Sequence, residues 1–439
     1  MQRLVMIMMA LLIVGAVAFW KFAPNFWSPP KAPAAPQPVE LAVWGLFEEE
    51  ANFRVIAENY QRTHPNIKIV YTKANLLNYR PRVQTKILNK EGPDVFMLHN
   101  TWVPMFQKTL ALQEAPATVF SVTDYAQIFY PVAKDSFIQN NKIYAVPASI
   151  NGLALFVNTD ILRAANVDIP QTWDQFLTSA VKMTVKDDRG NIQTAGAAIG
   201  TTENIEYWSD ILGLLFFQQP GADLNKPNTP EAVDILKFYT NFVHDPRQKV
   251  WDASVGSAVQ AFYSGRLAYY FAPSTKINDI KLANPQLHFQ IAPVPQLPGG
   301  NVGWGTFWGY AVSSTSPHSK EAWDFIKYLS SRDVETILFQ KNQEAGLVPE
   351  PYARFELQSS LSNDPLLAPI VNLATSFKSW YLSSKTMDQG VNDEMIKLFA
   401  TAVNSVNSGG DPQRALNVVE EGRAAILDKY VNNPPQPTK

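Results

Sequence analysis

Alternating apolar positions and helical repeats share the first hundred residues of the chain. Apolar residues alternate with polar or small ones over 39–43, 67–71 and 94–98, which predicts three strands. Apolar residues recur every three or four positions over 53–60, and a second helix is expected over 81–89. This β-α-β-α-β order predicts a parallel, doubly wound sheet, because a crossover helix brings each new strand parallel to the one before it.

The segments that follow the first and third strands are candidates for ligand contact. Trp44-Gly45 ends the first strand, and His99 and Trp102 follow the third. Open sheets of this class bind ligands at the carboxyl ends of their strands. Both tryptophans are therefore expected at the ligand-facing edge.

Helix and strand signals continue to alternate through the rest of the chain, and no internal repeat interrupts them. Thr172 stands where a residue would cap the amino end of the next helix. Helices are expected over 173–183, 205–217, 230–242, 257–264, 321–329, 333–341 and 392–406, and strands over 195–199, 267–271, 288–293 and 310–313.

One stretch, Asn140–Leu162 (NNKIYAVPASINGLALFVNTDIL), interrupts a strand pattern with polar residues. The alternation around Tyr144 stops at Ser-Ile-Asn-Gly, and a second apolar run resumes at Leu153. Either the chain makes a strand, a tight turn and a second strand, or the backbone bends there to face a ligand. The organisation of the flanking sequence favours a place where two lobes meet.

The amino terminus is strongly apolar. An uncharged run, Leu4–Trp20, follows Arg3 and ends at Lys21. We expect residues 1-22 to form an uncleaved membrane anchor, with a signal peptide cleaved after Ala16-Val17-Ala18 as the alternative. Residues 23-38 are rich in proline and predict a semi-rigid linker, and 432-439 predict a flexible tail.

Composition narrows the class of protein. Hydrophobic residues make up 46% and charged residues 17%, so the chain is expected to fold, and its length allows two or three domains. A net charge of −2, with both signs spread along the sequence, argues against nucleic-acid binding. The sequence has no cysteine, which excludes disulfides, thiolate metal sites and a cysteine nucleophile and agrees with export.

A series of phrases carries a resemblance to a known family. In order they are LAVWG, FRVIAENYQRTHPNIKIVY, EGPDVFML, NKIYAVPASINGLALFVNTDIL, PQTWDQFL, SAVQAFYSGRLAYYFAPS, IAPVPQLPGG, WGYAVSSTSPHSKEAWDFIKYLSS and EAGLVPEPY, which run from residue 41 to residue 352. Their order resembles the extracellular solute-binding proteins of ABC importers, in the carbohydrate-binding group that includes maltose-binding protein. The family's usual lipid-anchor cysteine is missing, which puts the mode of surface retention in doubt.

The resemblance implies an α/β periplasmic-binding-protein-like fold of two lobes, each a mixed, mainly parallel sheet with flanking helices, and a helical carboxyl-terminal part. Lobe 1 would comprise 39-147 and 274-345, and lobe 2 would comprise 148-273 and 346-431. The strand 148–155 would be one crossing between the lobes, and the region near Ala272 another. A monomer held at the outer face of the cytoplasmic membrane, or secreted, would then pass its solute to an ABC permease without chemistry on it.

The resemblance also places candidate contacts position by position. A sugar is held by aromatic platforms and by planar amide and carboxylate groups. Trp173 and Trp323 lie inside amphipathic helices and are expected in the core, and Trp251 is undecided. The candidate ligand contacts are Trp44, Gly45, His99, Trp102, Asn151, Glu203, Asn204, Trp208, Ser274, Trp304, Trp308, Trp380 and Tyr381.

Other chemistries leave weaker signals. The sequence lacks G-x-S-x-G, H-E-x-x-H and a P-loop, its five histidines are scattered, and no cofactor or metal is expected. A glycoside-acting enzyme would need two carboxylates around a scissile bond, for which Glu203, Glu206 and Asp210 could be nominated. A polyol phosphate, polyamine, metal ion or peptide remains an alternative ligand, and adhesion an alternative role. Glu48-Glu49-Glu50 is interpreted as the acidic start of a helix whose carboxylates could still reach the cleft rim.

Overall fold

The computed structural model describes residues 2–22 and 38–432. The predicted proline-rich linker and carboxyl-terminal tail lie outside the described residues, apart from Pro38 and Asn432. Contacts divide the chain into two units, Met1–Val39 and Glu40–Lys439.

The described part of the first unit includes the helix α1 (Gln2–Phe22), whose side chains from Leu4 to Phe19 are exposed. Within residues 2–22 and 38–432, no helix combines the length and apolar character that crossing a membrane requires. The expected membrane anchor over residues 1-22 stays a prediction.

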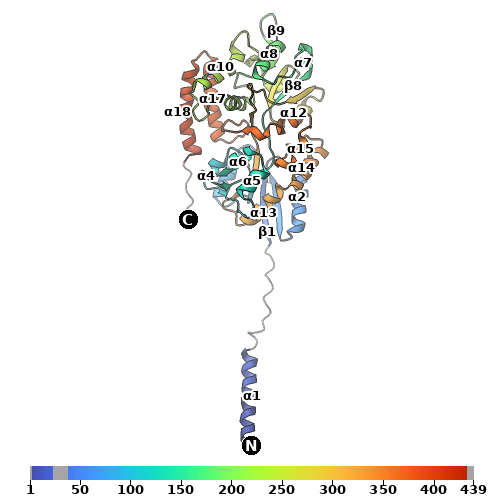
Figure 1. Ribbon diagram of the computed structural model, residues 1–439, viewed down its shortest axis with the longest axis vertical. Helices are drawn as coiled ribbons and strands as arrows, with labels where there is room; N and C mark the ends of the chain where they lie inside the picture. Colours follow the sequence, from blue (N-terminus) through green and yellow to red (C-terminus); the bar gives the residue numbers. More distant parts are fainter. Residues whose placement is uncertain (1, 23–37, 433–439) are drawn as a thin grey trace. The chain divides into compact units, whose positions relative to one another are not determined.

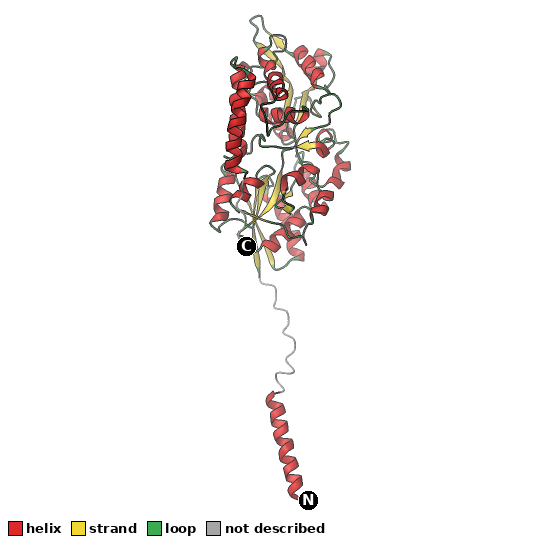
Figure 2. Ribbon diagram, turned by 60° about the vertical axis from the view of Figure 1, so that its left-hand side comes forward, coloured by secondary structure: helices red, strands yellow, loops and turns green. Residues whose placement is uncertain are grey.

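The second unit is built on two main sheets that lie in separate halves of the body, each flanked by helices (Figure 2). The first sheet has the order β2-β1-β3-β14-β4, with β7 beside β14. β1 and β3 are parallel, and β14 is antiparallel to β3. Its strands are β1 (Val39–Gly45), β2 (Ile67–Lys73), β3 (Val95–His99), β4 (Leu112–Gln113), β7 (Val146–Pro147) and β14 (Trp308–Ser313).

Helices of the first half follow from local signals. α2 begins at Glu50, where an acidic residue in the first turn is favoured by the helix dipole, and its buried face is Phe53, Ile56, Ala57 and Tyr60. The elements of this half are α2 (Glu50–Thr63), α3 (Tyr79–Leu88), α4 (Val103–Lys108), α5 (Val122–Ile128), α6 (Pro131–Phe137), β5 (Ile138–Gln139), β6 (Lys142–Ile143), α13 (Ser319–Leu329) and α14 (Arg332–Glu344).

The second sheet has the order β12-β8-β11-β10-β9. β8 is antiparallel to both β11 and β12, while β10 and β11 are parallel. Its strands are β8 (Ala154–Asn158), β9 (Val185–Lys186), β10 (Ile192–Ala197), β11 (Leu267–Ala272) and β12 (Phe289–Ala292). Every residue of β8 and β11 is buried, as expected for central strands covered by helices on both faces.

Helices of the second half also begin where the sequence predicts. α8 carries a capping box. The Thr172 hydroxyl accepts from the backbone N–H of Gln175, and Gln175 Oε1 accepts from the backbone N–H of Thr172. The elements are α7 (Thr159–Ala165), α8 (Trp173–Met183), α9 (Trp208–Gln218), α10 (Pro230–His244), η2 (Ala253–Val255), α11 (Ala258–Tyr263) and α12 (Lys276–Ala283).

The carboxyl-terminal third ends in two long helices, α17 (Val391–Asn407) and α18 (Pro412–Tyr430), which pack on each other and on α10 (Figure 1). The end of α18 reaches the first half, where Lys108 on α4 donates to the carbonyl of Asn432. The preceding elements are β13 (Gly303–Trp304), η3 (Phe355–Leu357), α15 (Gln358–Leu361), α16 (Ala368–Val371), η4 (Ala374–Ser376) and β15 (Phe377–Lys378).

The strand pairing corrects one expected crossing. β11 ends at Ala272, but the chain stays with the second sheet through β12, which pairs with β8, and it joins the first sheet only at β14. Residues 289–292 therefore pair within the second sheet, whereas the expected lobe 1 includes them in 274-345. The sequence could not reveal this, because a strand's neighbours depend on contacts between distant residues. The other lobe boundaries remain predictions.

Candidate ligand-binding cleft

Aromatic residues gather where β1 and β3 end and β14 begins. Phe47 follows β1, His99 ends β3, and Trp308 opens β14 opposite His99. The half-buried Trp308 ring makes edge-on contacts with Phe47 at 5.5 Å and His99 at 5.0 Å between ring centroids. Trp102 lies behind Trp308, at 4.9 Å, and is fully buried. Trp308 is thus supported on one side by a packed aromatic cluster.

His99 is a neutral polar group at this edge. Its Nδ1 lies 2.9 Å from the Thr101 hydroxyl, and its Nε2 lies 3.1 Å from the Thr306 hydroxyl. Burial lowers the pKa of His99 to about 3, because the ring is 1% exposed and the charged form would lose its hydration. The imidazole can therefore offer hydrogen bonds without charge.

Asn151 forms hydrogen bonds with residues that are far apart in the sequence. Its Oδ1 accepts from the backbone N–H groups of Gly152 and Ser274, and its Nδ2 donates to Glu350 Oε1 at 3.0 Å. The backbone carbonyl of Asn151 accepts from the N–H of Thr306. Through its side-chain amide and its backbone carbonyl, this buried residue thus joins four parts of the chain.

A cavity of about 230 Å³, here called the central cavity, opens at this junction. It receives side chains from the edge of the first sheet, from the Asn151 junction and from the second half of the body. Its lining consists of Phe47, Leu76, His99, Asn151, Tyr207, Pro273, Thr275, Thr306, Trp308, Glu350, Ser384, Lys385 and Thr386. Aromatic faces, an amide, hydroxyls and a carboxylate converge there, which is the mixture that binds a polar ligand with apolar faces.

The far wall of the central cavity comes from the second half. Tyr207 precedes α9, and burial raises its pKa well above the usual value, so its hydroxyl stays protonated. Lys385 lies 3.7 Å from Glu206, whose other oxygen accepts from Tyr270 at 2.7 Å. The cation in this wall therefore already has a carboxylate partner.

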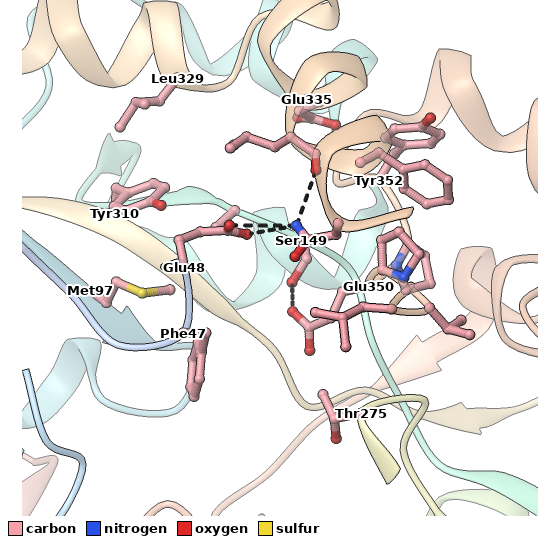
Figure 3. Close-up of a pocket in the computed structure, with 18 of the residues that line it drawn as sticks. Phe47, Glu48, Met97, Ser149, Thr275, Tyr310, Leu329, Glu335, Glu350 and Tyr352 are labelled. Carbon is pink, nitrogen blue, oxygen red and sulfur yellow. Dashed lines mark hydrogen bonds between the residues drawn. The ribbon is translucent and has the colours of Figure 1, made fainter. Parts of the chain in front are cut away.

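A second cavity, also about 230 Å³, adjoins the first, and we call it the acidic cavity (Figure 3). Phe47, Thr275 and Glu350 line both cavities. Glu48 enters from the loop after β1, and Glu335 enters from α14. Ser149, two residues before Asn151, donates to Glu350 at 2.6 Å.

Of the predicted contacts, His99, Asn151 and Trp308 line the central cavity, and Ser274 lies beside it with its N–H bonded to Asn151. Trp44 and Gly45 line neither cavity. Arg82 lies over the half-buried Trp44 ring, and a Cβ on Gly45 would overlap the Tyr71 ring. This close approach gives Gly45 a packing role.

The predicted second-half loop is held by its own bonds. Asn204 accepts from Trp251 Nε1 at 3.1 Å and donates to two backbone carbonyls, so its amide is fully used. Glu203 is exposed and accepts from Thr202. Trp208, at the start of α9, is 6% exposed. None of the three lines the two cavities described above.

Trp304 is fully buried against α9. Its Nε1 donates to Asp210 Oδ1 at 2.8 Å, and Asp210 Oδ2 accepts from the backbone N–H of Ser384 at 3.1 Å. Burial raises the pKa of Asp210 to about 7, although both bonds favour its ionised form. The predicted aromatic contact thus joins β13 to α9 and to the carboxyl-terminal segment.

Trp380 and Tyr381 face a different cavity, of about 330 Å³. Their rings lie 5.3 Å apart, and Trp380 Nε1 is 3.4 Å from Asn225. Asn100, Phe217 and residues near the end of α18 complete this lining. The structure therefore does not bring this pair together with Trp308.

Phe47, Tyr207, Thr306 and Glu350 are cavity residues that the sequence did not nominate. Phe47 lies two residues beyond Gly45, so its position after a strand was an available signal. Glu350 reaches the site from beyond α14, and no local pattern marks it. Among the described residues, no group of three or more His, Asp or Glu side chains could hold a metal ion.

The chain belongs to the bacterial extracellular solute-binding protein family, whose model matches residues 44–336. The maltotriose-binding protein of Pyrococcus abyssi is 24% identical over 384 residues, 82% of this chain and 76% of that protein. The multiple sugar-binding protein of Streptococcus mutans is 24% identical over 308 residues, which cover 65% of this chain and 69% of that protein. Membership confirms the prediction of an extracytoplasmic binding protein and gives no support to an enzyme.

Solved structures agree on the fold. A cyclo/maltodextrin-binding protein complexed with maltotetraose has a TM-score of 0.71 at 19% identity, covering 90% of this chain and 99% of that chain. The sugar-binding protein MalE from Xanthomonas citri gives a TM-score of 0.72 at 19% identity, and the match covers 89% of this chain and 98% of that chain. This likeness confirms the predicted two-lobed α/β fold with a helical carboxyl-terminal part.

Proposed function

We propose that this protein captures a sugar or oligosaccharide in the central cavity and delivers it to an ABC-type permease. The carrying observation is the convergence of Trp308, Phe47 and Tyr207 with Asn151 and Glu350 in one cavity. Aromatic faces match the C–H face of a sugar ring, and the amide and carboxylate match its hydroxyls. The names of the two curated relatives, which bind maltotriose and multiple sugars, support the same class of ligand.

Capture would proceed by closure of the two lobes around the ligand. The cavity is lined from both halves of the body, so a ligand there would stabilise the closed arrangement over the open one. His99, Asn151 and Trp308 are the predicted contacts that we retain for the central cavity. Trp380 and Tyr381 remain a proposed contact only for a ligand that extends into their separate cavity.

The test is a thermal-stability and tryptophan-fluorescence titration of the full chain against mono- and oligosaccharides. A ligand at 100 times its Kd adds about 2.7 kcal/mol to the folded state, which raises the Tm measurably. Trp308→Ala should weaken binding at least tenfold, whereas Trp380→Ala, a half-buried tryptophan in the other cavity, should leave it within twofold. If no saccharide changes Tm or fluorescence, or if cleaved sugar is recovered, this function is wrong.

We further propose that α1 directs the protein to the membrane, as a retained anchor or a cleaved signal, and that the protein acts as a monomer. The exposed apolar side chains from Leu4 to Phe19 support membrane targeting. Cell fractionation with amino-terminal sequencing of the mature protein distinguishes anchor from signal. Recovery of an unprocessed chain in the cytoplasm would contradict both, and light scattering measures the oligomeric state.

A further inference from the structure

The acidic cavity lacks a cation among the residues that line it. Glu48, Glu335 and Glu350 all contribute to its wall, whereas none of its described lining residues is Lys, Arg or His. Buried carboxylates are ordinarily paired, because removing a charge from water is costly without a partner. Three carboxyl groups therefore share this cavity without a lining cation to compensate their ionised forms.

Glu335 leaves one oxygen without a partner. The side chain is 6% exposed, Oε2 accepts from the backbone N–H of Arg354 at 3.2 Å, and Oε1 is buried with no hydrogen bond among the described residues. The Arg354 guanidinium bonds instead to Glu356 at 2.8 Å and to the carbonyl of Ser330 at 2.9 Å. Burial raises the pKa of Glu335 to about 8.

Glu48 is also poorly compensated. Asn342 Nδ2 lies 3.4 Å from both of its oxygens, at the long limit for a hydrogen bond. Lys73, whose charge lowers the pKa of Glu48, pairs with Glu49 at 2.6 Å. Burial raises the pKa of Glu48, and the charge of Glu350 raises it further. Glu350 itself accepts from Ser149 and Asn151, so its position is fixed at the boundary of the two cavities.

We propose that the ligand is an amino sugar whose primary ammonium group enters the acidic cavity, which is lined by the carboxyl groups of Glu48, Glu335 and Glu350. This inference rests on the proposed sugar-binding function and names the class of sugar. The sugar ring would lie against Trp308 in the central cavity, because Phe47, Thr275 and Glu350 line both cavities. An ammonium group supplies three hydrogen-bond donors and one positive charge. Glu335 Oε1 has no hydrogen-bond donor among the described residues, and Glu48 has only the long contacts with Asn342.

Calorimetric titration of the full chain in mild detergent at pH 7.0 tests this inference. The probes are a β-1,4-linked glucosamine disaccharide, its di-N-acetylated counterpart and the neutral glucose disaccharide with the same linkage. The amine should bind at least tenfold more tightly than both uncharged probes. Glu335→Gln and Glu48→Gln should each weaken amine binding at least tenfold and change binding of the uncharged probes less than threefold. Glu344→Gln, an exposed carboxylate on the same helix α14, serves as the matched control and should have no effect.

The outcomes separate the two proposals. Equal binding of amine and uncharged probes, or undiminished amine binding by both Gln variants, overturns the amino-sugar inference and leaves sugar binding intact. The comparison of probes on the unmodified protein holds even if a variant fails to fold. If none of the saccharides binds, the proposed function is wrong. Binding of spermidine in the absence of any saccharide binding would assign the ammonium chemistry to a polyamine and overturn both.

Discussion

At the scale of single residues, the environment of His99 decides its charge. The ring is buried and bonded to neutral partners, so its pKa in the folded protein, about 3, lies below the ordinary value of 6.5. A histidine with a depressed folded pKa contributes stability above the unfolded pKa and loses it as the pH falls toward the folded pKa. We expect this residue to cost about 1.4 kcal/mol of stability per pH unit below 6.5.

Urea unfolding at pH 7.5, 6 and 5 measures this effect. His99→Gln keeps a neutral polar side chain that does not titrate, so the variant should lose less stability than the natural chain over this range. The difference between the two proteins removes the contributions of other titrating groups. Parallel pH dependences would mean that His99 is not the buried neutral group described above.

Asp210 is a second buried titratable residue, and its hydrogen bonds predict how its substitution changes stability. Asp210→Ala leaves the N–H groups of Trp304 and Ser384 unpaired, which costs about 1–3 kcal/mol for each donor. Asp210→Asn retains one acceptor and should cost less. Since the folded pKa is raised from 3.8 to about 7, the contribution of this carboxyl is full below pH 3.8 and is lost as the pH rises through 7.

Chemical denaturation of both variants at pH 5 and pH 8 tests these expectations. The stability gap between the natural chain and Asp210→Asn should narrow, or reverse, at pH 8. A gap that grows with pH would contradict the raised pKa.

At the scale of elements, the fit of β13 on α9 depends on a missing side chain. Gly213 lies within α9, and a Cβ there would overlap the ring of Trp304. Gly213→Ala is expected to cost about 1–3 kcal/mol through overpacking, although alanine favours helices more than glycine. In a Trp304→Leu background the same substitution should cost less or stabilise, because the ring is gone. Urea midpoints of the four proteins give the coupling, and an equal cost in both backgrounds would contradict it.

Element boundaries were predicted well from local patterns. The helix expected over 173–183 is α8, and the helix expected over 392–406 is α17 within one residue at each end. Local periodicity and caps encode such boundaries. Local patterns did not predict which sheet each strand joins, since β12 pairs with β8 and not with a strand of the first sheet.

At the scale of the whole molecule, closure of the lobes makes a measurable prediction. The sequence has no cysteine, so paired spin labels can be introduced without background. Labels at Lys86→Cys on α3 and Lys186→Cys on β9 report the separation of the two halves, and both positions are exposed. Saturating ligand should shorten and narrow the distance distribution. The pair Lys186→Cys and Lys237→Cys lies within the second half and should not change, and ligand binding without any shift in the first pair would exclude closure.

The sequence by itself determined the order of strands and helices, the class of fold and the membership in a solute-binding family. It also placed Trp173 and Trp323 in the core, where both are buried. These features depend on periodicity and phrases that neighbouring residues carry. Only the tertiary structure decided which tryptophan faces the central cavity, because Trp308 and the fully buried Trp304 have similar local sequences. The joining of Asn151 with Ser274 and Glu350, and the gathering of three carboxyl groups around one cavity, likewise depend on contacts between residues far apart in the chain.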